Sequence, residues 1–226
     1  MTDYVFAPSP VPSLAVAGIA ARFPVRRIWC VGRNFAAHAR ELGNDAREPP
    51  FFFAKQPDML VAGGGVIAYP SMTGNLHYEA ELVVALKAGG ENIAEDRAAG
   101  MIFGYAAGLD MTRRDLQKQM QEKGKPWEIG KSFEQSAPVG LLTPSSALMT
   151  GGAIRLLVNG ETRQGSDLSH MIWSVAEVIA RLSRQVTLAR GDIIFTGTPE
   201  GVGPVVAGDR LRVEIAGLEP LDVTIA

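Results

Sequence analysis

The sequence contains very little cysteine and histidine, which limits the chemistry that its side chains can support. Among 226 residues there are one cysteine, Cys30, and three histidines. A single thiol cannot form an internal disulfide, so the fold does not depend on an oxidising compartment. Cys30 lies in the apolar run RRIWCVG, which favours packing in a buried strand over a nucleophilic role. His38, His77 and His170 lack the i, i+4 spacing of a helical zinc site, so no zinc centre is predicted.

The chain also lacks long hydrophobic runs and any marked excess of charge. No apolar stretch approaches the roughly 20 residues that a membrane-spanning helix needs. The N-terminus lacks the basic and apolar segments of a signal peptide. The formal net charge of −2 gives no reason to expect nucleic acid or an anionic membrane as a partner. We therefore expect a soluble, cytoplasmic protein.

Segments typical of strands outnumber those typical of helices, and the two do not alternate regularly. Short apolar stretches predict buried strands, Asn159-Gly160 predicts a hairpin turn, and the apolar spacing within 169–185 predicts a helix. The irregular order argues against a doubly wound sheet and for an α+β fold with a large mixed β-structure. Residues 1–24, rich in Pro and Ala, predict an extended N-terminal arm before a domain of residues 25–226.

Two glutamates stand one residue apart at the start of the apolar run HYEAELVVAL. In a strand, Glu79 and Glu81 project to the same side, where their carboxylates repel each other unless a cation lies between them. Such oxygen ligands suit Mg²⁺, Mn²⁺ or Ca²⁺. A solvated acidic face is the alternative, but the same face continues as Val83 and Ala85. Asp110, after the apolar stretch MIFGYAAGL, is either a third ligand or a helix N-cap.

Further side chains could supply acid–base or electrostatic catalysis. His38 and Glu41 share a face of a predicted helix over 33–43, where a carboxylate would orient an imidazole and raise its basicity; an exposed ion pair is the alternative. Lys131, in GKSF, could stabilise an oxyanion or lie solvated at the surface. The loop TGTPEGVG lacks the ending of a phosphate loop, but its amides or the Thr198 hydroxyl could bind a carboxylate.

Five motifs occur in the order and spacing of the fumarylacetoacetate hydrolase superfamily, which the chain resembles over about residues 25–217. They are CVGRNFAAHARELG, HYEAELVVAL, GLDMTRRDLQ, GKSF and GDIIFTGTPEGVGP. The resemblance implies the mixed β-roll of that family and a homodimer. It also implies one Mg²⁺ or Mn²⁺ ion per chain, with Glu79, Glu81 and Asp110 as its ligands.

The resemblance assigns roles to the remaining candidates as well. His38 and Glu41 would match the pair that activates water, and Lys131 the catalytic lysine. The implied reaction is metal-dependent hydrolysis of a carbon–carbon bond in a 3-acylpyruvate, with fumarylpyruvate of the gentisate route as the expected substrate. The alternatives are decarboxylation or tautomerisation of oxaloacetate, hydration of a 2-oxo-4-enoate, or a metal-binding relative without activity. The oxo-acid end of the substrate would be bound by Arg33, Arg114, Gln117 and Thr198.

Two positions depart from the family pattern. Tyr78 stands where the family often has a second histidine, and strand alternation would direct it away from the metal. Gln56 separates Lys55 from Pro57, where the family often has Lys-Pro, which could shift the loop 55–63.

Overall fold

The computed structural model describes residues 3–35 and 48–226 of the chain. Its helices are α2 (Ala98–Met101), α3 (Arg114–Glu122), α4 (Glu128–Lys131) and α5 (Val175–Leu182). Short 3₁₀ turns occur at Pro57–Met59, Glu95–Arg97 and Leu168–His170. The strands are β1 (Ser13–Val16), β2 (Ile19–Pro24), β3 (Arg27–Gly32), β4 (Phe51–Lys55), β5 (Leu60–Ala62), β6 (Gly65–Ile67), β7 (Leu76–Tyr78), β8 (Ala80–Leu86), β9 (Ile102–Leu109), β10 (Thr112–Arg113), β11 (Ala137–Val139), β12 (Thr143–Pro144), β13 (Ala153–Val158), β14 (Glu161–Asp167), β15 (Asp192–Phe195), β16 (Gly203–Val205), β17 (Arg210–Ile215) and β18 (Leu221–Ile225).

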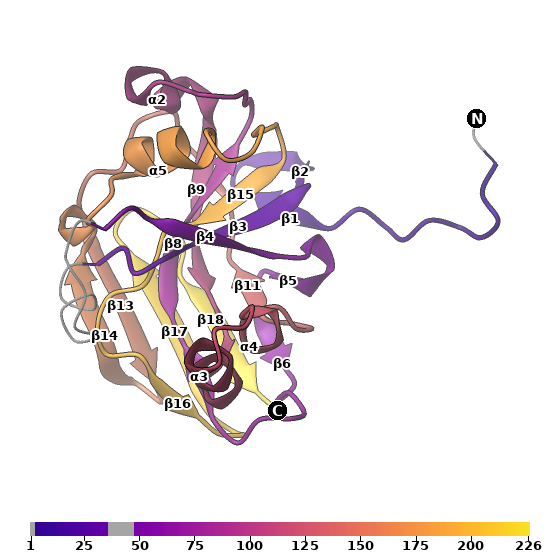
Figure 1. The fold of residues 1–226 in the computed structure, drawn as a ribbon, viewed down its shortest axis with the longest axis vertical. Coiled ribbons are helices and arrows are strands. Elements are labelled where there is room, and N and C mark those ends of the chain that lie inside the picture. The colour runs from indigo at the N-terminus through magenta and orange to yellow at the C-terminus, as the bar shows by residue number, and fades with distance from the viewer. Residues whose placement is uncertain (1–2, 36–47) are drawn as a thin grey trace.

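The described strands form mixed sheets around a large apolar core (Figure 1). The largest sheet has the order β4-β3-β15-β8-β9-β11-β5, with β12 paired to β9. Its β3–β15 and β5–β11 pairs are parallel and its other pairs antiparallel. A second sheet has the order β14-β13-β17-β18-β6, and the core lies between the two sheets and beneath α5. The predicted α+β class with mixed β-structure is confirmed.

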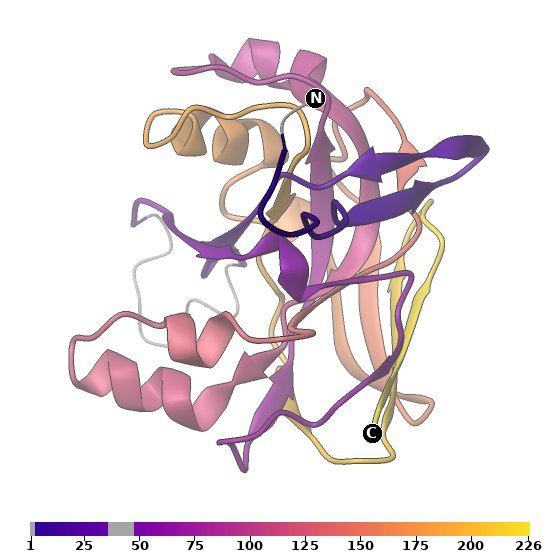
Figure 2. The same cartoon turned by 90° about the vertical axis from the view of Figure 1, so that its right-hand side faces the viewer.

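The helices cover only parts of the sheets. Figures 1 and 2 show α2 and α5 toward one end of the long axis, and α3 and α4 toward the other. The predicted helix within 169–185 begins only at Val175, because Ser174 caps it and Glu177 completes a capping box. No helix in the described part of the chain is both long and apolar enough to cross a membrane.

The N-terminal residues divide into two parts. Residues 13–24 form the β1–β2 hairpin, whose Leu14, Val16 and Phe23 are buried in a second, smaller core. Residues 3–10 are exposed and extend away from the body of the molecule (Figure 1), whereas the Pro12 carbonyl accepts a hydrogen bond from the Val25 amide at 2.8 Å. Burial of three hairpin side chains ties residues 13–24 to the body through apolar contact.

Strand β8 is buried on both faces, and its side chains alternate between the two cores. Leu82, Val84 and Leu86 lie in the larger core, whereas Val83 and Ala85 lie in the smaller one. A strand covered on both faces is normally apolar along its length. The buried carboxylate of Glu81 in the same strand is therefore an exception that calls for compensating charge.

The predicted alternation over 76–86 is confirmed, although the segment forms two strands rather than one. Strand β7 pairs with β10 and β16 in a small sheet, and β8 enters the largest sheet. Glu79 lies between the two strands, at the point where the chain passes from one sheet to the other. Tyr78 is buried in the larger core, as its place in the alternation predicts.

An ion-pair cluster joins β15 to β3 at the start of their parallel pairing. Asp192 is fully buried and accepts hydrogen bonds from Arg26 Nη1 at 3.0 Å, Arg27 Nη2 at 2.7 Å and the backbone of Ala189 at 3.0 Å. We expect Asp192→Ala to lower the free energy of unfolding by about 1–3 kcal/mol, because the Ala189 amide and the partly exposed Arg26 and Arg27 lose a shared, fully buried acceptor. Urea unfolding followed by circular dichroism measures this change.

Asp222→Ala provides the matched control for this prediction. Asp222 also pairs with an arginine, Arg212, at 2.8 Å, but the Asp222 side chain is 65% exposed, whereas that of Asp192 is fully buried. An exposed pair contributes under about 1 kcal/mol. If Asp192→Ala and Asp222→Ala lowered the free energy of unfolding equally, burial of Asp192 would not explain its contribution.

Candidate active site

Three buried carboxylates meet at the junction of β7, β8 and β9. Glu79 precedes β8, Glu81 lies within it, and Asp110 directly follows β9. The antiparallel β8–β9 pairing aligns Glu81 with Gly108, and the Asp110 amide donates to the Glu79 carbonyl at 2.9 Å. Their carboxylate oxygens include a set that lies within 4.8 Å of one another. The structure thus brings together the three acids that the sequence predicts as metal ligands.

Lysine and arginine side chains surround these carboxylates. Lys131 Nζ donates to Glu79 Oε2 at 2.8 Å and to Asp110 Oδ2 at 2.7 Å. Arg114 forms an ion pair with Glu79, and Lys55 Nζ lies 2.9 Å from Asp110 Oδ1. Lys131 is therefore buried and paired, which excludes the alternative of a solvated surface lysine.

The electrostatic environment shifts the pKa values of Glu79 and Glu81 in opposite directions. Burial raises the pKa of Glu79, but Lys131 and Arg114 outweigh it and bring the pKa down to about 2. Burial and the neighbouring charges of Asp110 and Glu79 raise the pKa of Glu81 well above its usual value. Burial also lowers the pKa of Lys131, but Asp110 and Glu79 more than offset this, and its pKa is raised. Glu79 and Lys131 are therefore held in their charged forms, whereas Glu81 lacks sufficient positive charge nearby.

The carboxylate group fits a hard divalent cation. Asp110 already has ammonium groups at both carboxylate oxygens, whereas Glu81 has no ion-pair partner among the described residues and is bonded through Oε2 only to the Gly197 amide at 2.7 Å. Buried carboxylate oxygens without sufficient partners need a cation. An all-oxygen donor set of three carboxylates suits Mg²⁺ or Mn²⁺. Glu79, Glu81 and Asp110 are the residues that could hold it.

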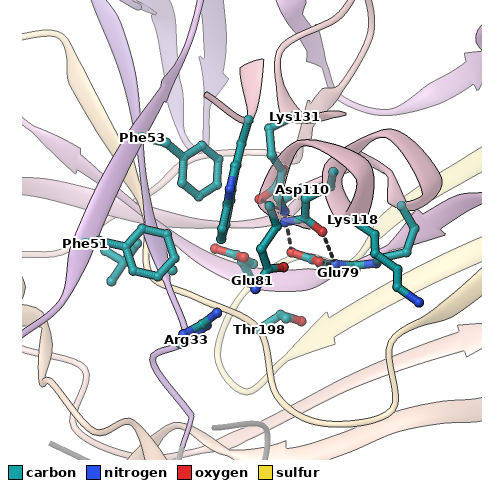
Figure 3. A pocket seen from close by; sticks show the side chains of 15 residues that line it. Arg33, Phe51, Phe53, Glu79, Glu81, Asp110, Lys118, Lys131 and Thr198 are labelled. Carbon is teal, nitrogen blue, oxygen red and sulfur yellow. Dashed lines mark hydrogen bonds and ion pairs between the residues drawn. The ribbon is translucent and has the colours of Figure 1, made fainter. Parts of the chain in front are cut away.

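The carboxylates open into a cavity of about 290 Å³ (Figure 3). Its aromatic wall includes Phe51 and Phe53 of β4 together with Trp127, whose ring lies 5.1 Å from that of Phe51. A Cβ at position 32 would lie 1.9 Å from Phe51, so only glycine leaves room for this ring. The predicted substrate-binding residues all line the cavity: Arg33, Arg114, Gln117 and Thr198.

Two of these residues are held by helix α3 and two by loops. Arg114 and Gln117 lie one turn apart on α3, with Arg114 Nη1 donating to Gln117 Oε1 at 2.5 Å. Thr198 Oγ1 accepts a hydrogen bond from Gln164 Nε2 at 2.9 Å, in the loop after β15. Arg33 follows the end of β3. Segments far apart in the sequence therefore converge on one cavity.

Sequence reasoning assigned no role to Lys55 or to Gln164. Lys55 is 2 % exposed, and its ammonium group also donates to the carbonyls of Lys131 and Met111. Gln164 Oε1 accepts from the amide of Ala80 at 3.0 Å, which links the Thr198 loop to β8. The lysine at the end of the aromatic strand FFFAK was the available signal for Lys55, since a charged residue in such a strand needs a partner. His38 and Glu41 lie outside the described residues.

Comparison with known proteins places this fold and site in a family. The model of the family described as fumarylacetoacetate (FAA) hydrolase C-terminal matches residues 27–226. The chain belongs to this family, as the five sequence motifs indicate.

Several relatives are similar over most of their length. The chain is 47% identical to a fumarylpyruvate hydrolase of Ralstonia sp over 79% of this chain and 93% of the relative. It is 40% identical to the mitochondrial oxaloacetate tautomerase of Homo sapiens, over 88% of this chain and 95% of that protein. The crystal structure of fumarylpyruvate hydrolase from Pseudomonas aeruginosa in complex with Mn²⁺ and pyruvate has a TM-score of 0.96 and 52% identity, covering 99% of each chain.

Proposed function

We propose that this protein hydrolyses fumarylpyruvate, a 3-acylpyruvate, to fumarate and pyruvate with a bound Mg²⁺ or Mn²⁺ ion. The observation that carries the proposal is the buried group of Glu79, Glu81 and Asp110 beside Lys131 in the cavity wall. The support from relatives is the structure, 52% identical, of a fumarylpyruvate hydrolase with Mn²⁺ and pyruvate.

The reaction needs a water molecule, an electrophilic carbonyl and a place for negative charge. The divalent ion would act as a Lewis acid toward the oxo-acid part of the substrate. Arg114, Gln117 and Thr198 bind that end through charge and hydrogen bonds. Water adds to the distal carbonyl, the bond between C3 and C4 breaks, and its electron pair remains on C3. The released pyruvate enolate then takes up a proton.

Lys131 supplies positive charge where the distal carbonyl oxygen becomes negative. Its ammonium group is buried, and its hydrogen bonds to Glu79, Asp110 and Thr112 hold it in place. A fixed charge in a site shielded from water stabilises a transition state without needing to reorganise. Lys55 is a positioning residue in this scheme, because it forms an ion pair with Asp110 and donates a hydrogen bond to the carbonyl of Lys131.

His38 is proposed as the base that takes a proton from water, with Glu41 orienting it. We expect His38→Ala to lower kcat by about 10²–10⁴-fold, the usual contribution of a general base, while Mn²⁺ affinity stays within a few fold. Steady-state kinetics and isothermal titration with Mn²⁺ measure the two effects. His170→Ala is the control, because His170 is exposed and outside the cavity wall. Normal hydrolysis by His38→Ala would show that another group activates water.

Oxaloacetate is the competing substrate, since a relative 40% identical to this chain is an oxaloacetate tautomerase. Assays of three compounds, each with Mn²⁺ and with chelator, distinguish acylpyruvate hydrolysis from reactions of oxaloacetate. The compounds are fumarylpyruvate, acetylpyruvate and oxaloacetate. Pyruvate release reports hydrolysis or decarboxylation, and decay of enol absorbance in oxaloacetate reports tautomerisation. Metal-dependent cleavage of fumarylpyruvate at the highest rate would support the proposal. Activity on oxaloacetate alone would overturn it.

A homodimer, a cytoplasmic location and a place in gentisate breakdown remain predictions. Metal-dependent cleavage of fumarylpyruvate would support the predicted place in gentisate breakdown. Light scattering coupled to size-exclusion chromatography would test the dimer directly.

A further inference from the structure

Arg33 differs from the other cations of the cavity wall in having no acidic partner among the described residues. Lys131 and Arg114 both pair with Glu79. Lys118 lies 3.9 Å from Glu122 and is 75 % exposed, so water already solvates it. Arg33 is half-buried and lines the cavity. A partly desolvated charge without a counter-charge favours binding of an anion.

The chain holds Arg33 in a specific and unusual backbone conformation. Its φ angle is +59°, in the left-handed region that residues other than glycine seldom occupy. The next residue, Asn34, is fully buried and donates to the carbonyls of Trp173 at 2.9 Å and Thr196 at 2.7 Å. The Asn34 side chain also accepts from the Trp173 amide at 2.8 Å. These contacts fix the backbone that directs Arg33 and offset its conformational strain.

An aromatic surface supports the side chain of Arg33. Its guanidinium carbon lies 5.7 Å from the ring centroid of Phe51, within reach of a cation–π contact. Beyond Phe51, a hollow of about 370 Å³ adjoins the cavity and is lined by Phe53 and Trp127 as well as Arg33. Arg33 therefore borders both the carboxylate cavity and an aromatic extension of it. A planar, conjugated acyl group would be in contact with such walls.

Arg33 also approaches the site from a different element than Arg114 and Gln117, two of the three residues proposed for the oxo-acid end. Arg114 and Gln117 belong to α3, whereas Arg33 follows β3. Figure 3 shows Arg33 between Phe51 and Thr198, and Lys118 of α3 on the other side of the carboxylates. A substrate whose oxo-acid end faces α3 would direct its acyl end toward Arg33.

We propose that Arg33 binds the distal carboxylate of a dicarboxylic 3-acylpyruvate, and so selects acyl groups that end in a carboxylate over neutral groups such as acetyl. This role differs from the oxo-acid contact that family resemblance implies for Arg33. The inference rests on the proposed hydrolase function. The planar guanidinium fork suits a carboxylate because it can donate two parallel hydrogen bonds.

The ratio of kcat/KM for fumarylpyruvate to kcat/KM for acetylpyruvate tests this assignment. We expect the wild-type enzyme to prefer fumarylpyruvate, and Arg33→Gln to lower the ratio by about 10- to 100-fold, the usual worth of hydrogen bonds to a charged group. The loss should lie mainly in KM, because the distal carboxylate does not change during the reaction. Arg33→Lys keeps the charge without the fork and should lower the ratio by about 3- to 10-fold.

Controls separate this role from a structural one. Arg155→Gln removes the same charge from an exposed position on β13 and should leave the ratio unchanged. Mn²⁺ titration and thermal unfolding establish that each variant is folded and binds metal. If Arg33→Gln does not fold, the Arg33→Lys variant decides the test.

Four results would overturn the inference while leaving hydrolysis intact. The first is a wild-type enzyme without preference for fumarylpyruvate. The second and third are that Arg33→Gln lowers kcat/KM equally for both substrates, or for neither. The fourth is that Lys118→Gln, rather than Arg33→Gln, lowers the ratio. Cleavage of neither substrate by the wild-type enzyme would instead remove the proposed function, and the inference with it.

Discussion

Replacing Glu81 with glutamine is expected to abolish divalent-metal binding and to lower hydrolysis by about 10³-fold or more. Glu81 is one of three buried carboxylates whose oxygens converge within 4.8 Å. A metal ion contributes several kcal/mol to transition-state stabilisation, and each 1.36 kcal/mol corresponds to about tenfold in rate. Glutamine keeps the size of the side chain and an acceptor for the Gly197 amide. The substitution therefore removes charge while leaving the local packing in place.

The stability of the Glu81→Gln variant distinguishes loss of a ligand from misfolding. Without metal, the variant should be as stable as the wild-type protein or more stable, because burial and two neighbouring carboxylates disfavour the Glu81 charge. Mn²⁺ should raise the Tm of the wild-type protein but not that of the variant. Calorimetry with and without Mn²⁺ measures both, and Glu161→Gln at the surface is the control. Full activity of metal-free enzyme would contradict the metal site itself.

Replacing Lys131 with methionine is expected to lower both activity and stability. Lys131 is buried and forms ion pairs with Glu79 at 2.8 Å and with Asp110 at 2.7 Å. Breaking a buried pair by removing one partner lowers the free energy of unfolding by about 3–5 kcal/mol, since the carboxylates keep their desolvation penalty. Loss of the positive charge should also lower kcat by about 10²–10³-fold, as for removal of one oxyanion donor.

Measurements with Mn²⁺ distinguish the effect of Lys131→Met on stability from its effect on kcat. Mn²⁺ binding to the acidic group should restore part of the lost stability, because a divalent cation replaces the missing charge. It should not restore kcat, because the wild-type enzyme would hold the same ion and the variant would still lack the charge of Lys131. Urea unfolding and kinetics at saturating Mn²⁺ test both claims. Lys87→Met, at an exposed position, is the control. Near-normal kcat at saturating metal would remove Lys131 from the catalytic role.

The sequence by itself determined those parts of the site that lie on one strand or in one short motif. Strand periodicity places Glu79 and Glu81 on the same side, and the structure confirms it by burying Leu82 and Val84 in one core and Val83 in the other. The period of two is a local property of the extended backbone, so neighbouring residues suffice to predict it.

Only the tertiary structure decided which distant segments meet at the carboxylates. Lys55 contacts Asp110, and Gln164 joins the Thr198 loop to β8, although long stretches of sequence separate these partners. Strand pairing between distant segments depends on how whole sheets pack, and residue patterns within one segment carry little information about it. The absence of an acidic partner for Arg33 among the described residues is likewise a property of the assembled cavity. Local periodicity therefore suffices to align the acids, whereas long-range packing determines which cations among the described residues lie beside them.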